Sequence, residues 1–267
     1  MTDFLKSTST ATSEAATAAS VDTRAMYLDL MKKIVANLIY GDPTTNPGGF
    51  RPYDPELRKI GKGWPRDAHT MIGMKRLDNI QYCVETIIQE RIPGDLIETG
   101  VWRGGACIFM RAILKAYGEC DRKVWLADSF QGLPRPDANK YPADSGDKLH
   151  EEAELAVSLE QVQSNFRLYG LLDKQVEFLP GWFRDTLPAA PIEELAILRL
   201  DGDMYESTFV ALENLYPKLS SGGYCIIDDY SILEGCRKAV HDYRDKFKIT
   251  EPLETIDFSA VFWRKHK

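Results

Sequence analysis

The sequence predicts an α/β fold built on a mainly parallel, doubly wound sheet. From Asp95 onward, short apolar segments alternate with amphipathic ones, which is the pattern of strands joined by helical crossovers. Glycines and aspartates follow the apolar segments directly, at the sheet edge where open α/β sheets bind ligands. The chain has 267 residues, of which 44% are hydrophobic, so it is long enough to bury a substantial core.

Charge and cysteine usage argue against several classes of protein. The net charge is -7 and no long Lys/Arg block occurs, so we expect neither nucleic acid nor membrane as a partner. The five cysteines are scattered without a C-x-x-C pair, which argues against a disulfide framework or a zinc site. No apolar run approaches the roughly 20 residues of a membrane span, and the start lacks the order of a signal peptide. These features predict a cytoplasmic protein.

The segment before the sheet is predicted to form a cap or subunit interface over residues 23–92. Residues 1–22 are rich in Ser, Thr and Ala and are expected to be a disordered tail. A first helix should begin at Thr23 and stop at Gly41, followed by a long loop over 41–66 and a second helix over 69–91. The first helix has apolar residues at helical spacing: Met26, Leu30, Ile34 and Leu38.

The core is predicted over residues 93–267, with seven strands. The strand segments are DLIETG, KVWLADSF, QVEFLP, ELAILRLDGD, GGYCIIDDY, EPLETID and SAVFWRK. The last two are joined by a short turn and should form an antiparallel edge. Residues 132–157 interrupt the alternation with prolines and glycine, and a loop this long is usually functional or mobile, so we expect a lid there.

A glycine-rich turn follows the first strand in ETGVWRGGACIF. Gly100, Gly104 and Gly105 would let the backbone pass close to a ligand and direct helix amide groups toward it. The spacing differs from the dinucleotide fingerprint G-x-G-x-x-G, and Glu98 before the first glycine favours a cationic ligand over a pyrophosphate. A tight turn that needs glycine for geometry alone is the alternative.

The next two strands also end in candidate binding residues. Asp128 at the tip of the second strand is placed to accept the ribose hydroxyls of a nucleoside, although a capping or turn role is the alternative. Gly181 and Trp182 follow the third strand, where an adenine ring needs a flat wall, unless Trp182 is a core residue. A glutamate before a glycine turn, followed by an aspartate on the next strand, resembles the S-adenosylmethionine site of class I methyltransferases.

Four aspartates follow the fourth and fifth strands, whose tips should converge. Like charges this close raise one another's pKa unless a cation lies between them, and an all-oxygen set suits Mg²⁺. The cation would make an acceptor hydroxyl more acidic. Asp203 is the leading candidate for the base, with His150 of the lid as the alternative, and helix capping is the plainer role for Asp203 and Asp229. The cluster comprises Asp201, Asp203, Asp228 and Asp229.

Long motifs in the chain resemble the macrocin O-methyltransferase family of the TylF and MycF type, which includes the noviose O-methyltransferase of the novobiocin pathway. The resemblance runs from about Tyr27 to Arg264. The motifs are AHTMIGMKRLDN, PGDLIETGVWRGGACIFMRAILKAYG, ADSFQGLP, LPGWFRDTLP, LRLDGDMYES and IIDDY.

The resemblance implies a class I, Rossmann-like methyltransferase core with an antiparallel last strand and an N-terminal helical cap. It implies Mg²⁺-dependent methyl transfer from S-adenosylmethionine to a sugar hydroxyl of a glycosylated natural product, in a homodimer or larger homo-oligomer. The implied metal ligands are Asp201, Asp228 and Asp229, with Asp203 as base. The implied cofactor contacts are Thr70, Met71, Glu98, Gly100, Arg103, Gly104, Asp128, Ser129, Gly181 and Trp182, with Thr70 and Met71 on the second helix.

Departures from the family pattern concern the acceptor. SILEGCR stands where the family often has Ile-Pro-Ala-Cys-Arg, so the wall around Ile232 is expected to differ, and Trp64 is a candidate acceptor contact. Two other functions remain open. One is a metal-dependent methyltransferase acting on a phenol or catechol, and the other is a catalytically silent nucleoside-binding protein.

Overall fold

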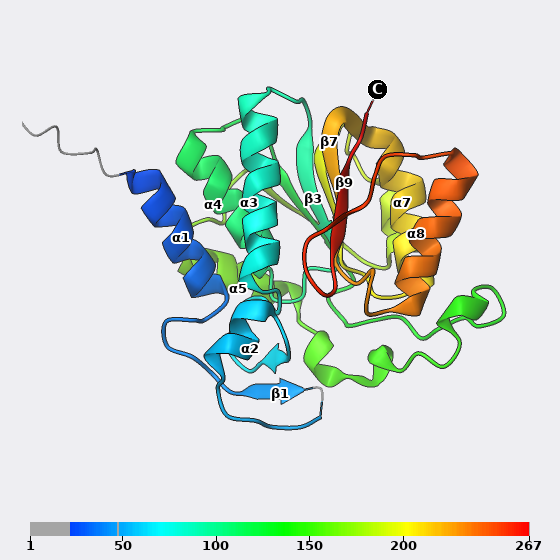
Figure 1. Ribbon diagram of the computed structural model, residues 1–267, viewed down its shortest axis with the longest axis horizontal. Coiled ribbons are helices and arrows are strands. Elements are labelled where there is room, and N and C mark those ends of the chain that lie inside the picture. Colours follow the sequence, from blue (N-terminus) through cyan, green and yellow to red (C-terminus); the bar gives the residue numbers. More distant parts are fainter. Residues whose placement is uncertain (1–21, 47, 267) are drawn as a thin grey trace, which may run out of the picture.

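A seven-stranded sheet forms the centre of the molecule (Figure 1). The structure is a computed structural model and describes residues 22–46 and 48–266. The strand order is β5-β4-β3-β6-β7-β9-β8. The strands are β3 (Asp95–Thr99), β4 (Val124–Asp128), β5 (Val176–Pro180), β6 (Leu195–Leu200), β7 (Leu219–Ile227), β8 (Glu254–Thr255) and β9 (Val261–Arg264).

The strand directions confirm the predicted mainly parallel sheet. Strands β3 to β7 pair in parallel, whereas β9 pairs antiparallel with both β7 and β8. The last strand therefore lies inside the sheet, and the short β8 forms the edge. The chain leaves β3 toward β4 on one side and returns to β6 on the other, so the switch in strand order falls between β3 and β6.

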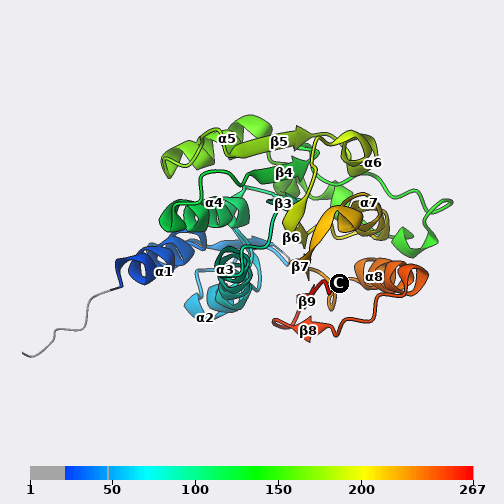
Figure 2. The ribbon, with the colours of Figure 1, turned by 90° about the horizontal axis from the view of Figure 1, so that it is seen from above.

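Helices cover both faces of the sheet (Figure 2). Side chains alternate along β3, so that Leu96 belongs to the core under α3, α4 and α5, and Ile97 to the core under α7 and α8. None of the helices among the described residues is both long and apolar enough to cross a bilayer. The helices are α1 (Thr23–Val35), α2 (Pro55–Ile60), α3 (Met74–Gln89), α4 (Gly105–Tyr117), α5 (Leu159–Leu168), α6 (Phe183–Thr186), α7 (Tyr205–Leu215) and α8 (Glu234–Phe247).

The first helix is shorter than predicted, and most of the predicted apolar stripe lies at the surface. Residues 1–21 of the expected tail lie outside the described residues, and Asp22 is the N-cap of α1. The helix ends at Val35, not at Gly41, because Asn37 adopts a left-handed conformation with φ 51°. The stripe packed inward is Leu28, Met31 and Val35, whereas the predicted residues Met26, Leu30 and Ile34 are exposed.

Residues 41–66 are not one long loop. They form a small sheet of β1 (Thr44–Asn46) and β2 (Trp64–Pro65), with α2 between them. A buried ion pair between Arg58 and Asp42, with Nη1 and Oδ1 2.6 Å apart, ties α2 to the end of α1. This segment is therefore folded, in contrast to the sequence prediction.

The second helix begins five residues later than predicted. His69 and Thr70 donate their backbone N–H groups to the Val35 carbonyl. This segment is therefore bonded to the end of α1 and forms no helical turn of its own. A Cβ on Gly73, the N-cap of α3, would lie 2.5 Å from the backbone of Ile60. Close packing against α2 thus fixes the point where α3 starts, and Thr70 and Met71 precede the helix.

Candidate functional site

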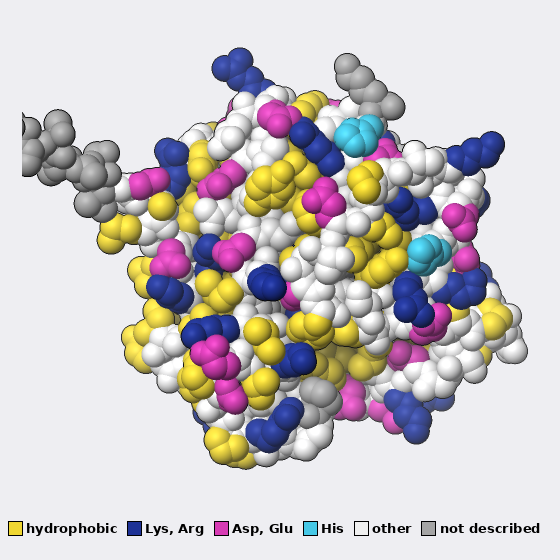
Figure 3. Space-filling model, viewed as in Figure 1, with side chains coloured by type: hydrophobic (Ala, Val, Ile, Leu, Met, Phe, Trp, Pro, Cys, Tyr) yellow, Lys and Arg dark blue, Asp and Glu magenta, His cyan; other side chains and the backbone are white. Residues whose placement is uncertain are grey.

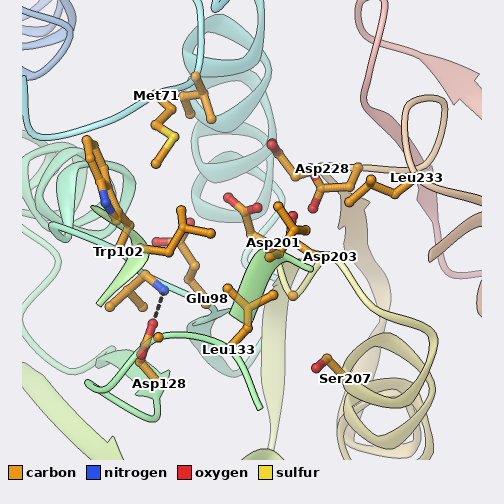
Figure 4. A pocket seen from close by; sticks show the side chains of 18 of the residues that line it. Met71, Glu98, Trp102, Asp128, Leu133, Asp201, Asp203, Ser207, Asp228 and Leu233 are labelled. Atoms are coloured by element: carbon orange, nitrogen blue, oxygen red, sulfur yellow. Dashed lines mark hydrogen bonds between the residues drawn. The ribbon is translucent and has the colours of Figure 1, made fainter. Parts of the chain in front are cut away.

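One large cavity opens at the carboxyl ends of the parallel strands, at the switch between β3 and β6. Its volume is about 650 Å³. Most of the predicted site residues line it, and Figure 4 shows several of them pointing toward one another from β3, β4, β6 and β7. These lining residues are Trp64, Thr70, Met71, Glu98, Gly100, Asp128, Ser129, Gly181, Trp182, Asp201, Asp203, Asp228, Asp229 and Ile232.

The glycine turn after β3 is set by a backbone contact with the tip of β6. Gly100 has φ 84°, and a Cβ there would lie 1.7 Å from the carbonyl oxygen of Asp201. No other residue fits, because both the conformation and the space exclude a side chain. The backbone of Gly100 therefore packs directly on the backbone of Asp201, and both residues line the cavity.

Asp128 fixes the shape of the turn and also faces the cavity. Its Oδ2 accepts a hydrogen bond from Val101 N at 2.8 Å, drawn in Figure 4, and its Oδ1 accepts one from Phe130 N at 2.7 Å. Burial raises the pKa of this carboxyl, and the backbone N–H donors oppose that rise. Asp128 thus holds the turn while it lines the cavity, so the turn role and the predicted binding role are compatible.

Glu98 lies at the base of the cavity and is almost fully buried. Its Oε1 pairs with Nη1 of Arg199, and its Oε2 accepts a hydrogen bond from the Cys107 thiol at 2.9 Å. Burial raises the pKa of Glu98 to about 7, although Arg199 favours the charged form. A cationic ligand group beside Glu98 would strengthen the ionised state.

The aspartate cluster has the chemistry of a cation site. Asp201, Asp228 and Asp229 each offer one oxygen, and these oxygens lie within 4.8 Å of one another. The buried Oδ2 of Asp229 has no hydrogen-bond partner among the described residues. Burial, followed by the neighbouring carboxylates, raises the pKa values of Asp201 and Asp229, so a cation among them would relieve a real electrostatic cost. The residues present therefore fit Mg²⁺.

Two arginines share this cluster and were not predicted. Arg199 donates from Nη1 to Asp201 Oδ2 at 2.8 Å and from Nη2 to Asp228 Oδ1, and Arg76 pairs with Asp228 Oδ2. Carboxylate oxygens have two lone pairs, so these contacts leave acceptor capacity for a cation. Arg199 had a signal in the sequence, since it is the single charge in the buried strand LAILRL.

Asp203 stands apart from the three clustered aspartates. It lies in the turn between β6 and α7 with φ 60°, a left-handed conformation that aspartate tolerates better than most residues. Burial raises its pKa well above the ordinary range, and the Asp201 and Asp228 carboxylates add to that rise. A carboxyl with a raised pKa is a stronger base than an ordinary aspartate.

Three predicted residues do not line the cavity. Arg103 donates from Nη1 to the carbonyl oxygens of Pro65 and Ala68, so it supports the segment before α3. Gly104 is the left-handed N-cap of α4, packed against α5. His150 is half-buried and is not among the lining residues, although its neighbour Leu149 is.

Residues 132–157 close one side of the cavity and are anchored at their centre and near their end. Asp144 accepts hydrogen bonds from the N–H groups of Tyr205 at 2.6 Å and Glu206 at 2.9 Å, so it caps α7 directly after the Asp203 turn. Trp102 Nε1 donates to the Glu154 carbonyl at 2.8 Å. Three short 3₁₀ turns run through the segment, which the prolines and glycine of the sequence did not predict.

The remaining wall comes from segments that the sequence analysis did not combine. Lys62, Trp64 and Ile232 face the cavity together with Phe258 of the turn between β8 and β9. The Lys62 Nζ lies 5.1 Å from the centre of the Phe258 ring. This side is more open than the strand tips, since Ile232 and Phe258 are 52% and 40% exposed.

The fold and this site define an S-adenosylmethionine-dependent O-methyltransferase of the class I, Rossmann-like type. The structure superimposes on that of the O-methyltransferase NovP with a TM-score of 0.88 and 54% sequence identity, covering 91% of this chain and all of the other. A calicheamicin methyltransferase, CalS11, has the same fold at 16% identity and a TM-score of 0.55.

The chain belongs to the macrocin-O-methyltransferase (TylF) family, whose sequence profile matches residues 45–265. It is 58% identical to the 8-demethyl-8-(2,3-dimethoxy-alpha-L-rhamnosyl)-tetracenomycin-C 4'-O-methyltransferase of Streptomyces olivaceus, over 91% of this chain and 94% of that protein. It is 54% identical to the demethyldecarbamoylnovobiocin O-methyltransferase of Streptomyces niveus, over 90% and 93%. Mycinamicin III 3''-O-methyltransferase of Micromonospora griseorubida is 53% identical, over 90% and 96%. The predicted family is therefore confirmed.

Proposed function

We propose that the protein transfers a methyl group from S-adenosylmethionine to a sugar hydroxyl of a glycosylated natural product, with Mg²⁺ in the site. The observation that carries this proposal is the convergence of Asp201, Asp228 and Asp229 at the cavity floor, beside the glycine turn. The names of the relatives at 53–58% identity support the acceptor class, because they describe a rhamnosyl-tetracenomycin, a novobiocin precursor and a mycinamicin.

The cofactor would lie along the tips of β3, β4 and β5. Glu98 would receive its ammonium group, Asp128 its ribose hydroxyls, and Trp182 its adenine ring, with Gly100 and Gly181 giving room for close approach. Thr70, Met71 and Ser129 line the same part of the cavity. Gly104 and Arg103 would act from outside, by shaping the turn and holding the segment that contains Thr70.

The chemistry follows from charge and position. The acceptor oxygen attacks the methyl carbon in line with the breaking C–S bond, so the sulfonium becomes a neutral thioether and the hydroxyl proton must leave. Mg²⁺, when bound by the three aspartates, supplies a lower pKa for the acceptor hydroxyl. Asp203 takes the proton, since it faces the cavity and its pKa is raised. His150 has the weaker position, outside the cavity lining.

The acceptor would enter from the open side of the cavity, where Trp64, Phe258 and Ile232 provide apolar contacts for a sugar face or an aglycone. The test is a screen of purified protein with S-adenosylmethionine, MgCl₂ and two acceptor panels, glycosylated natural products and free catechols, read by mass spectrometry. We expect a gain of one methyl group on a glycoside, which is lost in EDTA and restored by Mg²⁺. Turnover restricted to catechols, or turnover insensitive to EDTA, would contradict the proposal.

We also propose that residues 23–92 form a cap through which copies of the chain associate. Met26, Leu30 and Ile34 are 62%, 47% and 38% exposed on α1, and hydrophobic side chains gather along that edge of the molecule in Figure 3. Covering such a stripe is favourable by about 25 cal/mol per Å². Light scattering should give at least a dimer for the wild type and a smaller species for a Leu30→Glu, Ile34→Glu variant.

A further inference from the structure

A single guanidinium joins the two halves of the site. Arg199 is the last residue but one of β6 and is 0% exposed. Its Nη1 contacts Glu98 on β3 and Asp201 at the tip of β6, and its Nη2 contacts Asp228 on β7. Glu98 belongs to the proposed cofactor site, whereas Asp201 and Asp228 belong to the proposed cation site.

The chemistry of arginine makes this contact rigid. A guanidinium stays charged in proteins and presents its donors in a fixed planar fork, so each donor sets the direction of the carboxylate it meets. The backbone of Arg199 is also fixed, because it belongs to β6, a strand in which all six residues are buried. One buried side chain therefore orients the three carboxylates, and a bound ligand does not displace it.

Arg76 provides an internal comparison. It is also buried and pairs with Asp228, but its other carboxylate partner is Asp257 in the turn before β9, with Nε and Oδ2 3.0 Å apart. Arg76 has no contact with Glu98 among the described residues. It therefore touches the cation site alone, whereas Arg199 touches both sites.

From these contacts we infer that Arg199 is a positioning residue shared by the cofactor and cation sites, and that it couples their affinities. A change in the ion pair between Arg199 and Glu98 changes how strongly the same guanidinium pairs with Asp201 and Asp228. A ligand group that binds Glu98 thus alters cation affinity without touching the cation, and the effect is reciprocal. This inference rests on the proposed function for the identity of the two ligands.

The test measures the two affinities separately, by titration calorimetry with S-adenosylhomocysteine in EDTA and by electron paramagnetic resonance with Mn²⁺ alone. Arg199→Lys keeps the charge and loses the fork. It should weaken both ligands by about 10- to 100-fold, the range seen when groups that orient metal ligands are changed. Arg76→Lys should weaken Mn²⁺ and leave S-adenosylhomocysteine unchanged. Arg111→Lys, at a buried arginine of α4 paired with Asp173, is the control and should change neither affinity.

A second variant tests the coupling with Arg199 intact. In Glu98→Gln the guanidinium pairs only with Asp201 and Asp228, so Mn²⁺ affinity measured without cofactor should fall by about 5-fold or more. Unchanged Mn²⁺ affinity in this variant would overturn the inference even if Arg199→Lys did not fold, and so would wild-type values for both ligands in a folded Arg199→Lys protein. Wild-type protein that binds S-adenosylhomocysteine but no Mn²⁺ would instead overturn the proposed metal site and this inference together.

Discussion

The two sides of the cavity are built in different ways. On one side, Glu98, Asp128 and the aspartate cluster stand at strand tips and are held by buried hydrogen bonds and ion pairs. On the other side, Trp64 comes from β2, whereas Ile232 and Phe258 come from two connecting segments. These side chains are half-buried or exposed.

This difference separates chemistry from selectivity. Groups that must meet reacting atoms within a few tenths of an ångström are placed on the sheet, where neighbouring strands fix them. Groups that only need to contact a sugar or an aglycone are placed on segments whose sequence can change without disturbing the sheet. Variants on the first side should therefore change kcat, and variants on the second side should change KM for the acceptor.

The largest effect is expected for Asp201→Ala. Loss of one of three cation ligands should lower methyl transfer by about 10³-fold or more, because a bound cation contributes several kcal/mol to the transition state. Affinity for S-adenosylhomocysteine should change only by the coupling through Arg199, about 5-fold, since no residue of the nucleoside pocket is altered. Asp29→Ala on exposed α1 is the matched control. Undiminished turnover of Asp201→Ala in EDTA would refute the metal role.

Asp203→Asn should have the next largest effect. The amide keeps the size of the side chain and cannot accept the proton, so kcat should fall by about 10²- to 10⁴-fold. Mn²⁺ affinity should be retained, because Asp203 is not among the three clustered ligands. Single-turnover kinetics at saturating Mg²⁺ would check this, and an unchanged rate would move the base role to His150 or to solvent.

Asp144→Ala tests whether residues 132–157 support the side of the cavity that is formed by the strand tips. Two hydrogen bonds to the first turn of α7 are lost, so the free energy of unfolding should fall by about 1–2 kcal/mol. Because the Asp203 turn leads directly into α7, kcat should fall as well. Urea unfolding and steady-state kinetics measure both, with Asp137→Ala in the same segment as control. A lower free energy of unfolding with wild-type kcat would show that the Asp144 hydrogen bonds do not position Asp203.

Phe258→Ala should give the smallest effect and the clearest acceptor signature. Removing a ring that is already 40% exposed costs about 1 kcal/mol of apolar contact, which corresponds to a rise of about 5-fold in KM for the acceptor. KM for S-adenosylmethionine should not change. Phe247→Ala on α8 is the control, since that ring is similarly exposed and lies outside the cavity. A fall in kcat alone would contradict the division between the two sides.

Local sequence patterns predicted the sheet side well, because strand periodicity and the residues after each strand are local signals. Gly100, Asp128 and Asp201 could be placed at one edge from strand order alone. The more open side of the cavity could not be predicted in this way, because Phe258 and Lys62 come together only through tertiary packing. The start of α3 depends on contact between Gly73 and Ile60. Tertiary packing likewise decides which of the two apolar stripes of α1 is buried.

The position of β9 has a consequence for biosynthesis. β7 is made before β9, yet β9 pairs with its outer edge over Tyr224–Ile227, and Ser259 Oγ donates to the Asp228 carbonyl at 2.6 Å. Until β9 is in place, the outer edge of β7 is open and the Asp228 carbonyl lacks this donor, a state that favours association with other chains. Completion of the site therefore waits for β9, although every strand whose tip carries a proposed ligand residue precedes β9 in the chain.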